Sequence, residues 1–312
     1  MCSKNGDHIL KFSIFPNSTA RNGKPIMSAY AEALTNAGET VVENDMDADV
    51  AIIWSVLFQG NMARNKLVWD HYRKHNRPVI VLEVGVVKRN ITWRCGINGI
   101  AGDAYHGPDN NSDDRFEHSD LEIQPWRDTT DGNIIICGQH DDSAQWFTHN
   151  NQSVAQWIFN TVESWRAHDE VSTFIVRPHP RNRFDWNKIG SPDKLGYTRL
   201  QQPNKIEGTY DDFDFDKALQ QAKLVINYNS NPAIEAVLAG VPIMTHPSSR
   251  CWPVAQAIKY TDVIQKPDRQ QWANDLCYQE WTESEIRLGE PFRRIRPKLE
   301  EFKDKRYWDG MR

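Results

Sequence analysis

The chain has 312 residues, of which 39% are hydrophobic and 25% charged, a composition typical of a globular protein with one large domain or two of medium size. Its formal net charge is −5, from 37 Lys and Arg against 42 Asp and Glu. This excludes a uniformly basic nucleic-acid binder, though not a local basic surface.

The aromatic and cysteine contents narrow the class of protein further. The 12 Trp exclude a disordered chain and indicate an aromatic-rich core or ligand surface. The five cysteines form no CxxC pair and are odd in number, which is typical of reduced thiols. No signal peptide and no bilayer-spanning apolar run is evident. We therefore expect a soluble cytoplasmic protein, monomeric or a small homo-oligomer, with no membrane partner.

Strands and helices alternate in the first part of the chain. Apolar runs predict strands at 9–15, 49–54 and 78–82, and helical spacing predicts helices at 24–37 and 61–75. This alternation predicts βαβ units and a parallel sheet. The acidic stretch 103–122 is rich in turn formers and predicts an irregular excursion before a domain boundary.

The alternation restarts after residue 130. Strands are predicted at 133–137, 173–176, 224–227 and 241–244, and helices at 154–165, 217–223 and 232–239. From about residue 267 the pattern is helical. The prediction is an α/β fold with two Rossmann-like domains, 1–130 and 131–265, facing a cleft. A helical tail, 266–312, would pack back on the first domain.

Two polar segments directly follow predicted strands of the second domain, where parallel α/β sheets bind ligands. In the first, Arg177-Pro178-His179-Pro180-Arg181, the basic side chains Arg177, His179 and Arg181 offer phosphate contacts.

In the second segment, 229–235, Ser230 and Asn231 begin a helix at Pro232, and free N–H groups there favour phosphate. Glu235, one turn later, is placed to accept hydrogen bonds from sugar hydroxyls. A purely structural interpretation stays open for both segments, in which Asn-Pro caps a helix and His-Pro ends a strand.

These segments resemble the donor-binding half of GT-B glycosyltransferases with an HP motif, the group that includes capsule sugar transferases. The stretch SNPAIEAVLAGVPIM, at 230–244, matches the group's pattern of S…EAL..G.PV. The loop Gly138-Gln139-His140-Asp141-Asp142-Ser143 resembles the one that opens the donor domain there. The resemblance covers about residues 133–249. It implies that His179 and the Ser-containing helix start hold the phosphate of a nucleotide sugar.

The loop after 133–137 also has a physical interpretation of its own. It offers four candidate donor ligands, Gly138, Gln139, Asp142 and Ser143. Gly138 lets backbone approach a ligand closely, whereas Asp142 is equally a candidate N-cap. His140 and His149 are interpreted as solvated loop residues.

Acceptor candidates lie in the first domain. Glu83 ends a buried strand and is a candidate general base for an acceptor hydroxyl, with an ion pair to a nearby Arg as the structural alternative. Six residues are candidate acceptor ligands: Ser18, Ser55, Arg64, Trp93, Arg94 and Asn98.

The segment from Arg64 to Arg94 carries eight basic residues against two acidic ones, with Trp69, Tyr72 and Trp93 interleaved. This pattern suits a polyanionic acceptor such as DNA, with a solvated helix face as the plain alternative. The stretch 268–295 also resembles glycosyltransferase-like proteins of phage genomes. The basic segment and this resemblance together imply sugar transfer to a 5-hydroxymethylpyrimidine, such as hydroxymethylcytosine, in double-stranded phage DNA. The reaction would then take place in the host cytoplasm.

Other functions stay open at this point. The rival acceptor is a surface polysaccharide or lipid-linked sugar, as the capsule enzymes imply. Two functions of other classes also stay open: a nucleotide-binding module without catalysis, and a sugar-nucleotide epimerase.

No metal or further cofactor is expected beyond the donor, for which a UDP-sugar is favoured. The acidic run 211–216 lacks EF-hand spacing, and the GxGxxG, GxxxxGK[ST] and GxSxG motifs are absent. The departing phosphate would be neutralised by Arg177, His179 and Arg181 together with the helix start. His179 and Glu83 are thus the expected catalytic residues.

Overall fold

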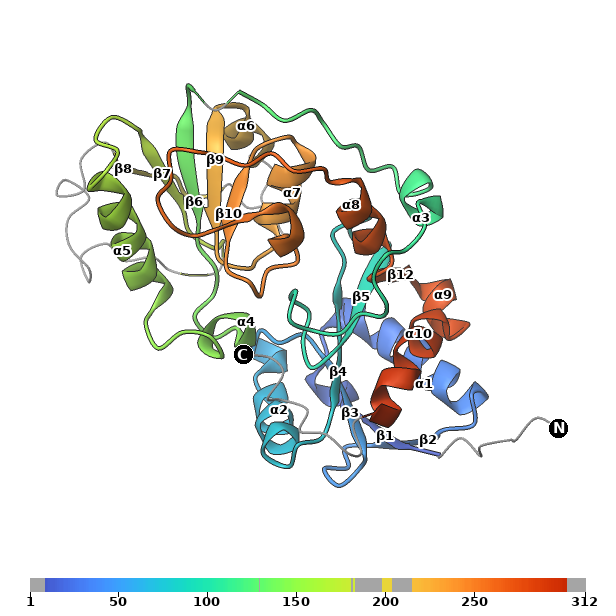
Figure 1. The fold of residues 1–312 in the computed structure, drawn as a ribbon. Coiled ribbons are helices and arrows are strands. Elements are labelled where there is room, and N and C mark those ends of the chain that lie inside the picture. The colour runs from blue at the N-terminus through green and yellow to red at the C-terminus, as the bar shows by residue number, and fades with distance from the viewer. Residues whose placement is uncertain (1–8, 129, 181, 183–197, 204–214, 302–312) are drawn as a thin grey trace. The chain divides into compact units, whose positions relative to one another are not determined.

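A computed structural model describes residues 9–128, 130–180, 182, 198–203 and 215–301 (Figure 1). The chain divides into two compact units. The described residues of unit 1 are 9–100, 104–111 and 275–301, and those of unit 2 lie within 101–103 and 112–274. Arg181 and the first part of the acidic run, 211–214, lie outside the described residues.

Unit 1 is built on a six-stranded sheet. Its strands are β1 (Lys11–Ile14), β2 (Thr40–Glu43), β3 (Val50–Trp54), β4 (Val79–Val84), β5 (Thr92–Ile97) and β12 (Glu280–Thr282). Its helices are α1 (Lys24–Asn36), α2 (Asn65–Lys74), α9 (Glu283–Arg287) and α10 (Glu290–Glu301). The strand order is β12-β5-β4-β3-β1-β2. The first four strands pair in parallel, as the alternation predicted, and α1 and α2 lie on opposite faces (Figure 1).

The core of unit 1 explains why these elements form. Every residue of β3 is buried, as expected of a strand covered on both faces. Helix α1 buries an apolar stripe that includes Ile26, Tyr30 and Leu34, at a spacing of one helical turn. Gly38 follows the helix with φ +85°, a conformation that glycine adopts without strain.

The C-terminal helix α10 belongs to this same core. Phe292 packs edge-on against Phe12, with 5.7 Å between ring centroids, and also against Tyr30. Ile295 and Leu299, on the same helix face, are buried in the cluster. Burying side chains of this size contributes about 1.5–3 kcal/mol each. Unit 1 therefore needs residues from both ends of the chain.

The sheet of unit 1 differs from the predicted parallel sheet at one edge. Strand β5 pairs antiparallel with β4, and β12 pairs antiparallel with β5. The sequence pattern gave β12 as helix, because it is three residues long between the helical patterns of α8 (Gln270–Cys277) and α9. Its pairing with β5, distant in sequence, overrides that local preference.

Unit 2 is built on a second six-stranded sheet. Its strands are β6 (Asn133–Cys137), β7 (Phe174–Arg177), β8 (Thr198–Leu200), β9 (Ala222–Asn227), β10 (Ile243–Thr245) and β11 (Gln256–Ala257). Its helices are α3 (Asp114–Glu117), α4 (Ala144–Phe147), α5 (Val154–Arg166), α6 (Phe215–Gln220) and α7 (Pro232–Leu238), and α8 crosses the boundary between the units.

The strand order in unit 2 is β11-β10-β9-β6-β7-β8, and each of these neighbouring strands pairs in parallel with the next. Helix α5 covers one face, while α6 and α7 lie on the other (Figure 1). The expected stripe on α5 is confirmed, because Trp157, Ile158 and Trp165 are all at most 7% exposed. A parallel sheet brings the carboxyl ends of its strands to one edge, where ligands bind.

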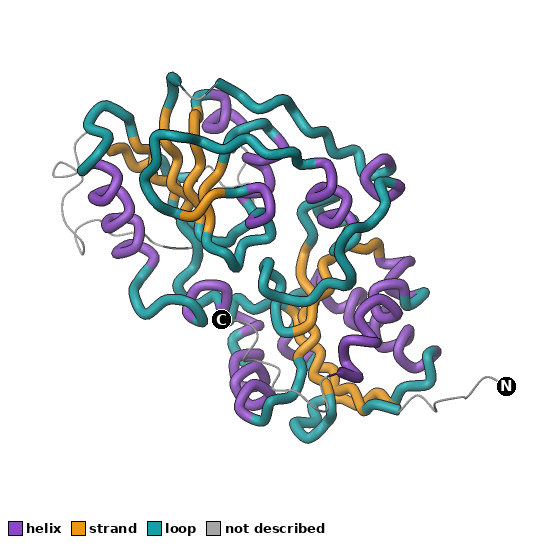
Figure 2. The backbone as a smooth tube through the Cα atoms, viewed as in Figure 1, coloured by secondary structure: helices purple, strands orange, loops and turns teal. Residues whose placement is uncertain are grey.

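The acidic stretch 103–122 is mostly loop, as predicted, apart from the short helix α3 (Figure 2). The boundaries differ from the predicted ones at three places. Residues 101–103 and 112–130 belong to unit 2 rather than to the first domain, and the stretch 266–274 belongs to unit 2 rather than to the tail.

Candidate functional site

In unit 2, four neighbouring parallel strands end in polar loops at one edge of the sheet. Strand β6 leads to 138–143 and β7 to 178–182, of which 181 is not described, while β9 leads to 228–231 and β10 to 246–250. These loops carry the predicted donor-binding residues. We call this edge the strand-end site.

Two buried amide side chains link the loops of the strand-end site. The backbone N–H of Asn229 donates to Gln139 Oε1 at 3.4 Å, and Asn229 Nδ2 donates to Ser248 Oγ at 2.8 Å. Gln139 is 3% and Asn229 4% exposed. Among the described residues, Gln139 Nε2 and Asn229 Oδ1 find no hydrogen-bond partner. Buried polar atoms without a partner are costly, so this edge offers one unused donor and one unused acceptor to a ligand.

The start of α7 adds a hydroxyl. Asn227 Nδ2 donates to Ser230 Oγ at 2.8 Å, and Asn227 Oδ1 accepts from the N–H of Ser230. The hydroxyl proton of Ser230 is thus left to donate elsewhere. Asn231 stands at the N-cap position before Pro232, as predicted, but makes no side-chain capping bond. Glu235 is exposed on the first turn of α7.

Arg177 does not have the environment of a phosphate ligand. Its guanidinium donates from Nη1 to Gln201 Oε1 at 2.6 Å and lies 5.5 Å from the ring centroid of Phe215. The side chain is 3% exposed. The expectation that Arg177 binds phosphate is therefore corrected, because its side chain is buried and bonded to Gln201 inside unit 2. Its predicted companion Arg181 is not described.

His179 lies next to His140 across the β6 and β7 loops. Their rings meet edge-to-face with 5.6 Å between centroids. His179 is half-buried. The interpretation of His140 as a solvated residue is wrong, since it is 6% exposed and its Nδ1 accepts from the N–H of Asp142 at 3.1 Å.

The remaining residues of the β6 loop have mixed positions. Ser143, not Asp142, is the N-cap of α4, and Asp142 is exposed. The N–H of Gly138 donates to the carbonyl of Arg177 at 2.7 Å, and a Cβ on Gly138 would lie 3.2 Å from Pro178 Cα. Close approach of protein backbone therefore already accounts for glycine at 138.

A histidine cluster beside this site was missed. Asp103 Oδ2 lies 2.8 Å from His149 Nε2, and the ring of His149 lies 5.2 Å from that of His246. His246 Nδ1 is 2.8 Å from Ser248 Oγ, which also binds Asn229. His149 was interpreted as solvated, but it is paired and largely buried.

The pKa of His246 is lowered from its usual value, first by burial and then by the neighbouring His149, while Asp103 opposes the shift. The sequence signal was His246-Pro247, a second His-Pro pair directly after a strand. It went unnoticed beside the first pair at 179–180.

In unit 1, the predicted acceptor residues Ser18 and Ser55 are brought together by a residue that was not predicted. Asn65 Nδ2 donates to the carbonyls of Ser18 and Trp54, at 2.9 and 2.7 Å. Asn65 is fully buried, and its Oδ1 has no partner among the described residues. Both serines are buried, and Ser55 has φ +64°. This arrangement lies at the carboxyl ends of β1 and β3.

Glu83 is half-exposed on β4, opposite Arg94 of β5 in the sheet register. Its Oε1 accepts from the N–H of Val84 at 2.8 Å. A role as general base stays a prediction. In the loop that follows, the backbone N–H groups of Val86 and Val87 are already satisfied, because both donate to Glu280 Oε2 at 2.8 Å.

Two predicted acceptor ligands, Arg94 and Asn98, are buried in unit 1, and a third, Trp93, is partly buried. Arg94 is 1% exposed, donates to the carbonyl of Ile100 at 3.0 Å and pairs with Glu280. Asn98 Oδ1 accepts from the N–H of Val79 at 2.9 Å, at the amino end of β4 and thus opposite to the ligand edge. Trp93 packs against the core. The expectations for Arg94 and Asn98 are corrected, because both side chains are buried and bonded within unit 1, while a role for the partly buried Trp93 stays a prediction.

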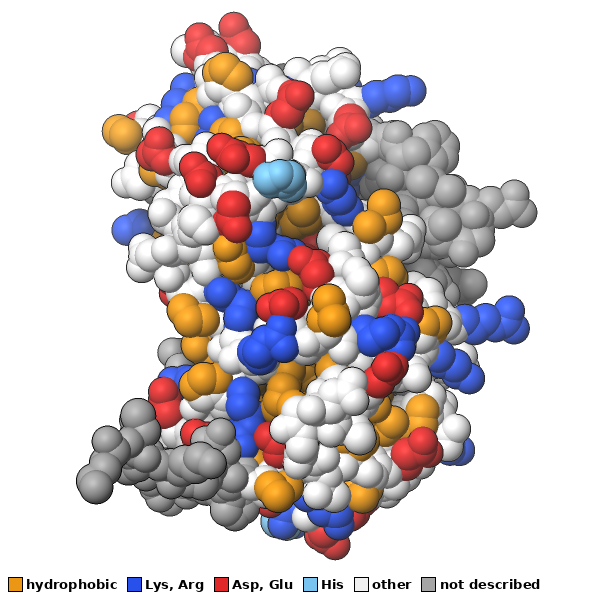
Figure 3. Space-filling view, turned by 90° about the vertical axis from the view of Figure 1, so that its right-hand side faces the viewer, with side chains coloured by type: hydrophobic (Ala, Val, Ile, Leu, Met, Phe, Trp, Pro, Cys, Tyr) orange, Lys and Arg blue, Asp and Glu red, His pale blue; other side chains and the backbone are white. Residues whose placement is uncertain are grey.

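Part of the DNA-binding surface that was predicted for the basic segment 64–94 is buried. Trp69 and Tyr72 are at most 3% exposed, so they are not available for stacking. Arg77 donates to the carbonyls of Met46 and Ala48. Arg64 is exposed, at the N-cap of α2. Figure 3 views the molecule from the right-hand side of Figure 1, whereas α2 lies on the left of unit 1; on the face shown, basic and acidic side chains are interspersed.

Within the described part of the chain, no three His, Cys, Asp or Glu side chains cluster closely enough to hold a metal ion. In the same part, no helix combines the length and the apolar character that crossing a membrane requires.

No protein-family model matches the chain, and no curated protein matches it. Solved structures match it in fold. The KpsC beta Kdo 2,4 transferase of Thermosulfurimonas dismutans is similar with a TM-score of 0.51 at 8% identity, covering 90% of this chain and 98% of that one. The KpsC beta Kdo 2,7 transferase of the same organism gives a TM-score of 0.45 at 13% identity, covering 92% and 99%. The chain thus has the predicted α/β fold with two Rossmann-like parts, similar to GT-B structures.

Proposed function

We propose that the protein is a glycosyltransferase whose unit 2 binds a nucleotide sugar at the strand-end site. The observation that carries the proposal is the pair of buried amides, Gln139 and Asn229, whose Nε2 and Oδ1 atoms lack partners among the described residues. They lie where parallel α/β sheets bind nucleotides. The fold likeness to a sugar transferase supports the reaction class.

The side chains of the strand-end site suit a phosphate group. Gln139 Nε2 is a donor without an acceptor among the described residues. The Ser230 hydroxyl accepts from Asn227 Nδ2 and keeps its own proton for a ligand, and the His179 ring lies on the adjacent loop beside His140. Donors held in place before the reaction stabilise the negative charge that develops on a departing phosphate. This set replaces the arginine-based one expected from the sequence, since Arg177 is committed elsewhere. Glu235 keeps its proposed role towards sugar hydroxyls.

We propose a saccharide hydroxyl as the acceptor, which is the alternative to DNA that the sequence left open. The DNA acceptor rested on aromatic side chains interleaved with basic ones, and Trp69 and Tyr72 are interior. Arg94, the end of the basic segment, is interior too. Glu83 remains the proposed base for the acceptor proton, because it is half-exposed at the end of β4.

The donor half is tested by mixing the protein with UDP-, CMP- and GDP-sugars and measuring nucleotide binding by calorimetry and nucleotide release by chromatography. At least one donor should bind and be turned over. His179→Ala and Ser230→Ala should weaken binding about tenfold each, the loss expected for one hydrogen bond to a charged group. His118→Ala, an exposed histidine of unit 2, is the matched control and should change nothing.

The acceptor half is tested with oligosaccharides and with DNA that contains hydroxymethylcytosine, each followed by mass spectrometry. A mass gain on the oligosaccharide is expected. A mass gain on DNA alone would reverse the choice of acceptor. If no nucleotide sugar binds or is turned over, the glycosyltransferase proposal is wrong.

A further inference from the structure

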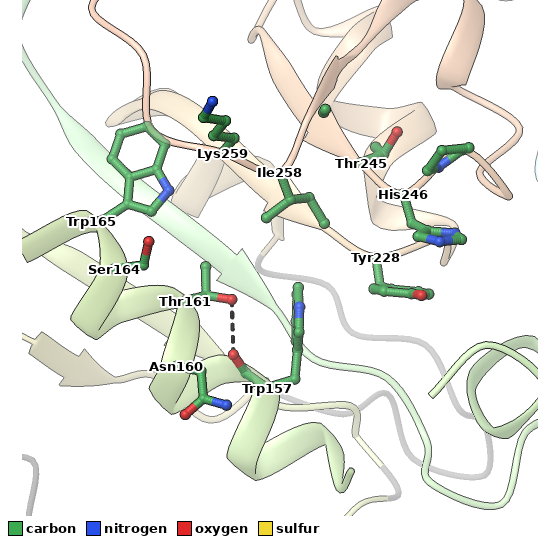
Figure 4. Close-up of a pocket in the computed structure, with 12 residues that line it drawn as sticks. Trp157, Asn160, Thr161, Ser164, Trp165, Tyr228, Thr245, His246, Ile258 and Lys259 are labelled. Atoms are coloured by element: carbon green, nitrogen blue, oxygen red, sulfur yellow. Dashed lines mark hydrogen bonds between the residues drawn. The ribbon is translucent and has the colours of Figure 1, made fainter. Parts of the chain in front are cut away.

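Unit 2 contains a pocket of about 390 Å³ that the proposed function does not use. One wall is helix α5, with Trp157 and Trp165 (Figure 4). The other wall combines Tyr228, which follows β9, with His246, which follows β10, and with Ile258 just after β11. We call this cavity the α5 pocket. Its volume lies in the range of small-molecule sites.

The walls of the α5 pocket are aromatic and fixed in place. Tyr228 and His246 stack with 4.4 Å between centroids and 11° between planes, and Trp157 meets Tyr228 edge-on at 5.8 Å. Such contacts hold each ring in one orientation. Rigid aromatic surfaces favour ligands with a flat apolar face, such as the C–H face of a pyranose or a planar ring.

One wall of the pocket contains a buried hydroxyl, that of Thr245. Thr245 lines the pocket, is 0% exposed, and its Oγ1 has no hydrogen-bond partner among the described residues. A buried hydroxyl of this kind destabilises the protein unless something else satisfies it. Asn160 and Ser164 also line the pocket and are exposed on α5. A ligand with several hydroxyls would use all three, whereas a purely apolar ligand would use none.

The charge of the α5 pocket is positive. Lys259 lines it and is exposed, no described carboxylate lies in the lining, and no ion pair of Lys259 is found among the described residues. A ligand that carries a carboxylate would therefore meet a cation and no opposing charge.

We propose that the α5 pocket binds a pyranose that carries a carboxylate. The ring would pack on the aromatic walls, its hydroxyls would reach Thr245 and Asn160, and the carboxylate would pair with Lys259. The pyranose would be either the sugar of the nucleotide donor or a residue of an acidic glycan. Only this choice of source rests on the proposed function. Ser248 connects the pocket to the strand-end site, because its Oγ binds both His246 and Asn229.

The test compares glucuronic acid with glucose, which differ by the carboxylate, and adds N-acetylneuraminic acid as a second acidic sugar. Binding is followed through the indole N–H signals of ¹⁵N-labelled protein, assigned with Trp157→Phe and Trp165→Phe. At least one acidic sugar should shift the Trp157 or Trp165 signal, with an affinity at least fivefold above that of glucose. Added salt should reduce this difference.

Two variants test whether Lys259 and Thr245 contribute to sugar binding in the α5 pocket. Lys259→Met should remove the preference for acidic sugar, whereas Lys217→Met, an exposed lysine on α6, should keep it. Thr245→Val should weaken acidic and neutral sugars alike while the thermal midpoint stays the same or rises, because a buried hydroxyl without a partner is removed. The proposal is overturned if neither acidic sugar shifts these signals, or if Lys259→Met binds as the unchanged protein does.

The source of the sugar is decided with UDP-glucuronic acid and with a glucuronic-acid-containing disaccharide. If the sugar belongs to the donor, Lys259→Met raises the KM for UDP-glucuronic acid and not for UDP-glucose. If it belongs to a glycan, the disaccharide shifts the indole signals and donor KM values stay unchanged. Acidic-sugar binding without turnover of any nucleotide sugar would refute the proposed function and leave the α5 pocket in place.

Discussion

Glu280 and Arg94 form a buried ion pair at the edge of the unit 1 sheet, with 3.7 Å between Oε1 and Nε. Neither side chain is more than 1% exposed. The second oxygen of Glu280 accepts from the N–H groups of Val86 and Val87 and from the Thr92 hydroxyl. One carboxylate thus fastens β12 both to β5 and to the loop after β4.

Loss of this carboxylate charge should destabilise unit 1 strongly. Glu280→Gln keeps the shape but leaves the guanidinium of Arg94 buried without its counter-ion, which typically costs about 3–5 kcal/mol. Urea titration followed by circular dichroism measures the change in the free energy of unfolding. Glu283→Gln, three residues further on and with a side chain 42% exposed, is the control and should cost less than about 0.5 kcal/mol. Equal effects of the two variants would show that the buried pair has no special role.

Gly85 should be intolerant of any side chain. An added Cβ would lie 2.3 Å from Glu280 Oε2 and 2.6 Å from the carbonyl oxygen of Thr92. Gly85→Ala must therefore displace either backbone or the buried carboxylate, with a cost of the order of 1–3 kcal/mol, as for overpacked sites. At Gly138 the nearest atom would be 3.2 Å away, so Gly138→Ala should cost less. Thermal unfolding of both variants ranks them, and the reverse order would contradict the prediction.

The buried thiols should be unreactive in the folded protein. Burial raises the pKa of Cys95 and of Cys251 to about 12, so little thiolate forms at pH 8. Iodoacetamide at pH 8, followed by peptide mass spectrometry, should leave both unmodified over hours and label both in urea. Ser112→Cys, at an exposed position, provides the reactive control. Labelling of Cys95 or Cys251 at the rate of that control would show that unit 1 or unit 2 opens readily.

The repeated α/β elements were predictable because their signals are local. Strand β6 and helix α5 appear within a residue of their predicted ranges, since continuous apolar runs and helical stripes reflect burial directly. Strands β5 and β12 were not predicted. Their pairing joins residues 92–97 to 280–282, and no local pattern encodes a partner so distant along the chain.

The candidate site was predictable in its place but only partly in its residues. Strand ends located Gln139 and Ser230, because parallel sheets gather their ligands there, whereas Asn229 lay in the predicted segment but was not singled out. Residue type alone misled at Arg177 and Arg94, whose side chains are buried and bonded inside their own units. Arginine is chosen equally for ligand phosphates and for buried carbonyl or carboxylate partners, and only the three-dimensional contacts distinguish the two uses.

The stability of unit 2 should depend on pH through His246. Its pKa in the folded protein is lowered below about 6.5, first by burial and then by His149, with Asp103 opposing. A group with a lowered folded pKa binds fewer protons in the folded state than in the unfolded one, so its contribution to stability is present above pH 6.5 and is lost as the pH falls through the folded value.

The urea midpoint should therefore decrease from pH 7.5 to pH 5. His246→Phe keeps a ring against Tyr228 and should show a smaller decrease, whereas His118→Ala, which is exposed, should match the unchanged protein. A pH dependence that is the same in His246→Phe and in the unchanged protein would assign the effect to other groups.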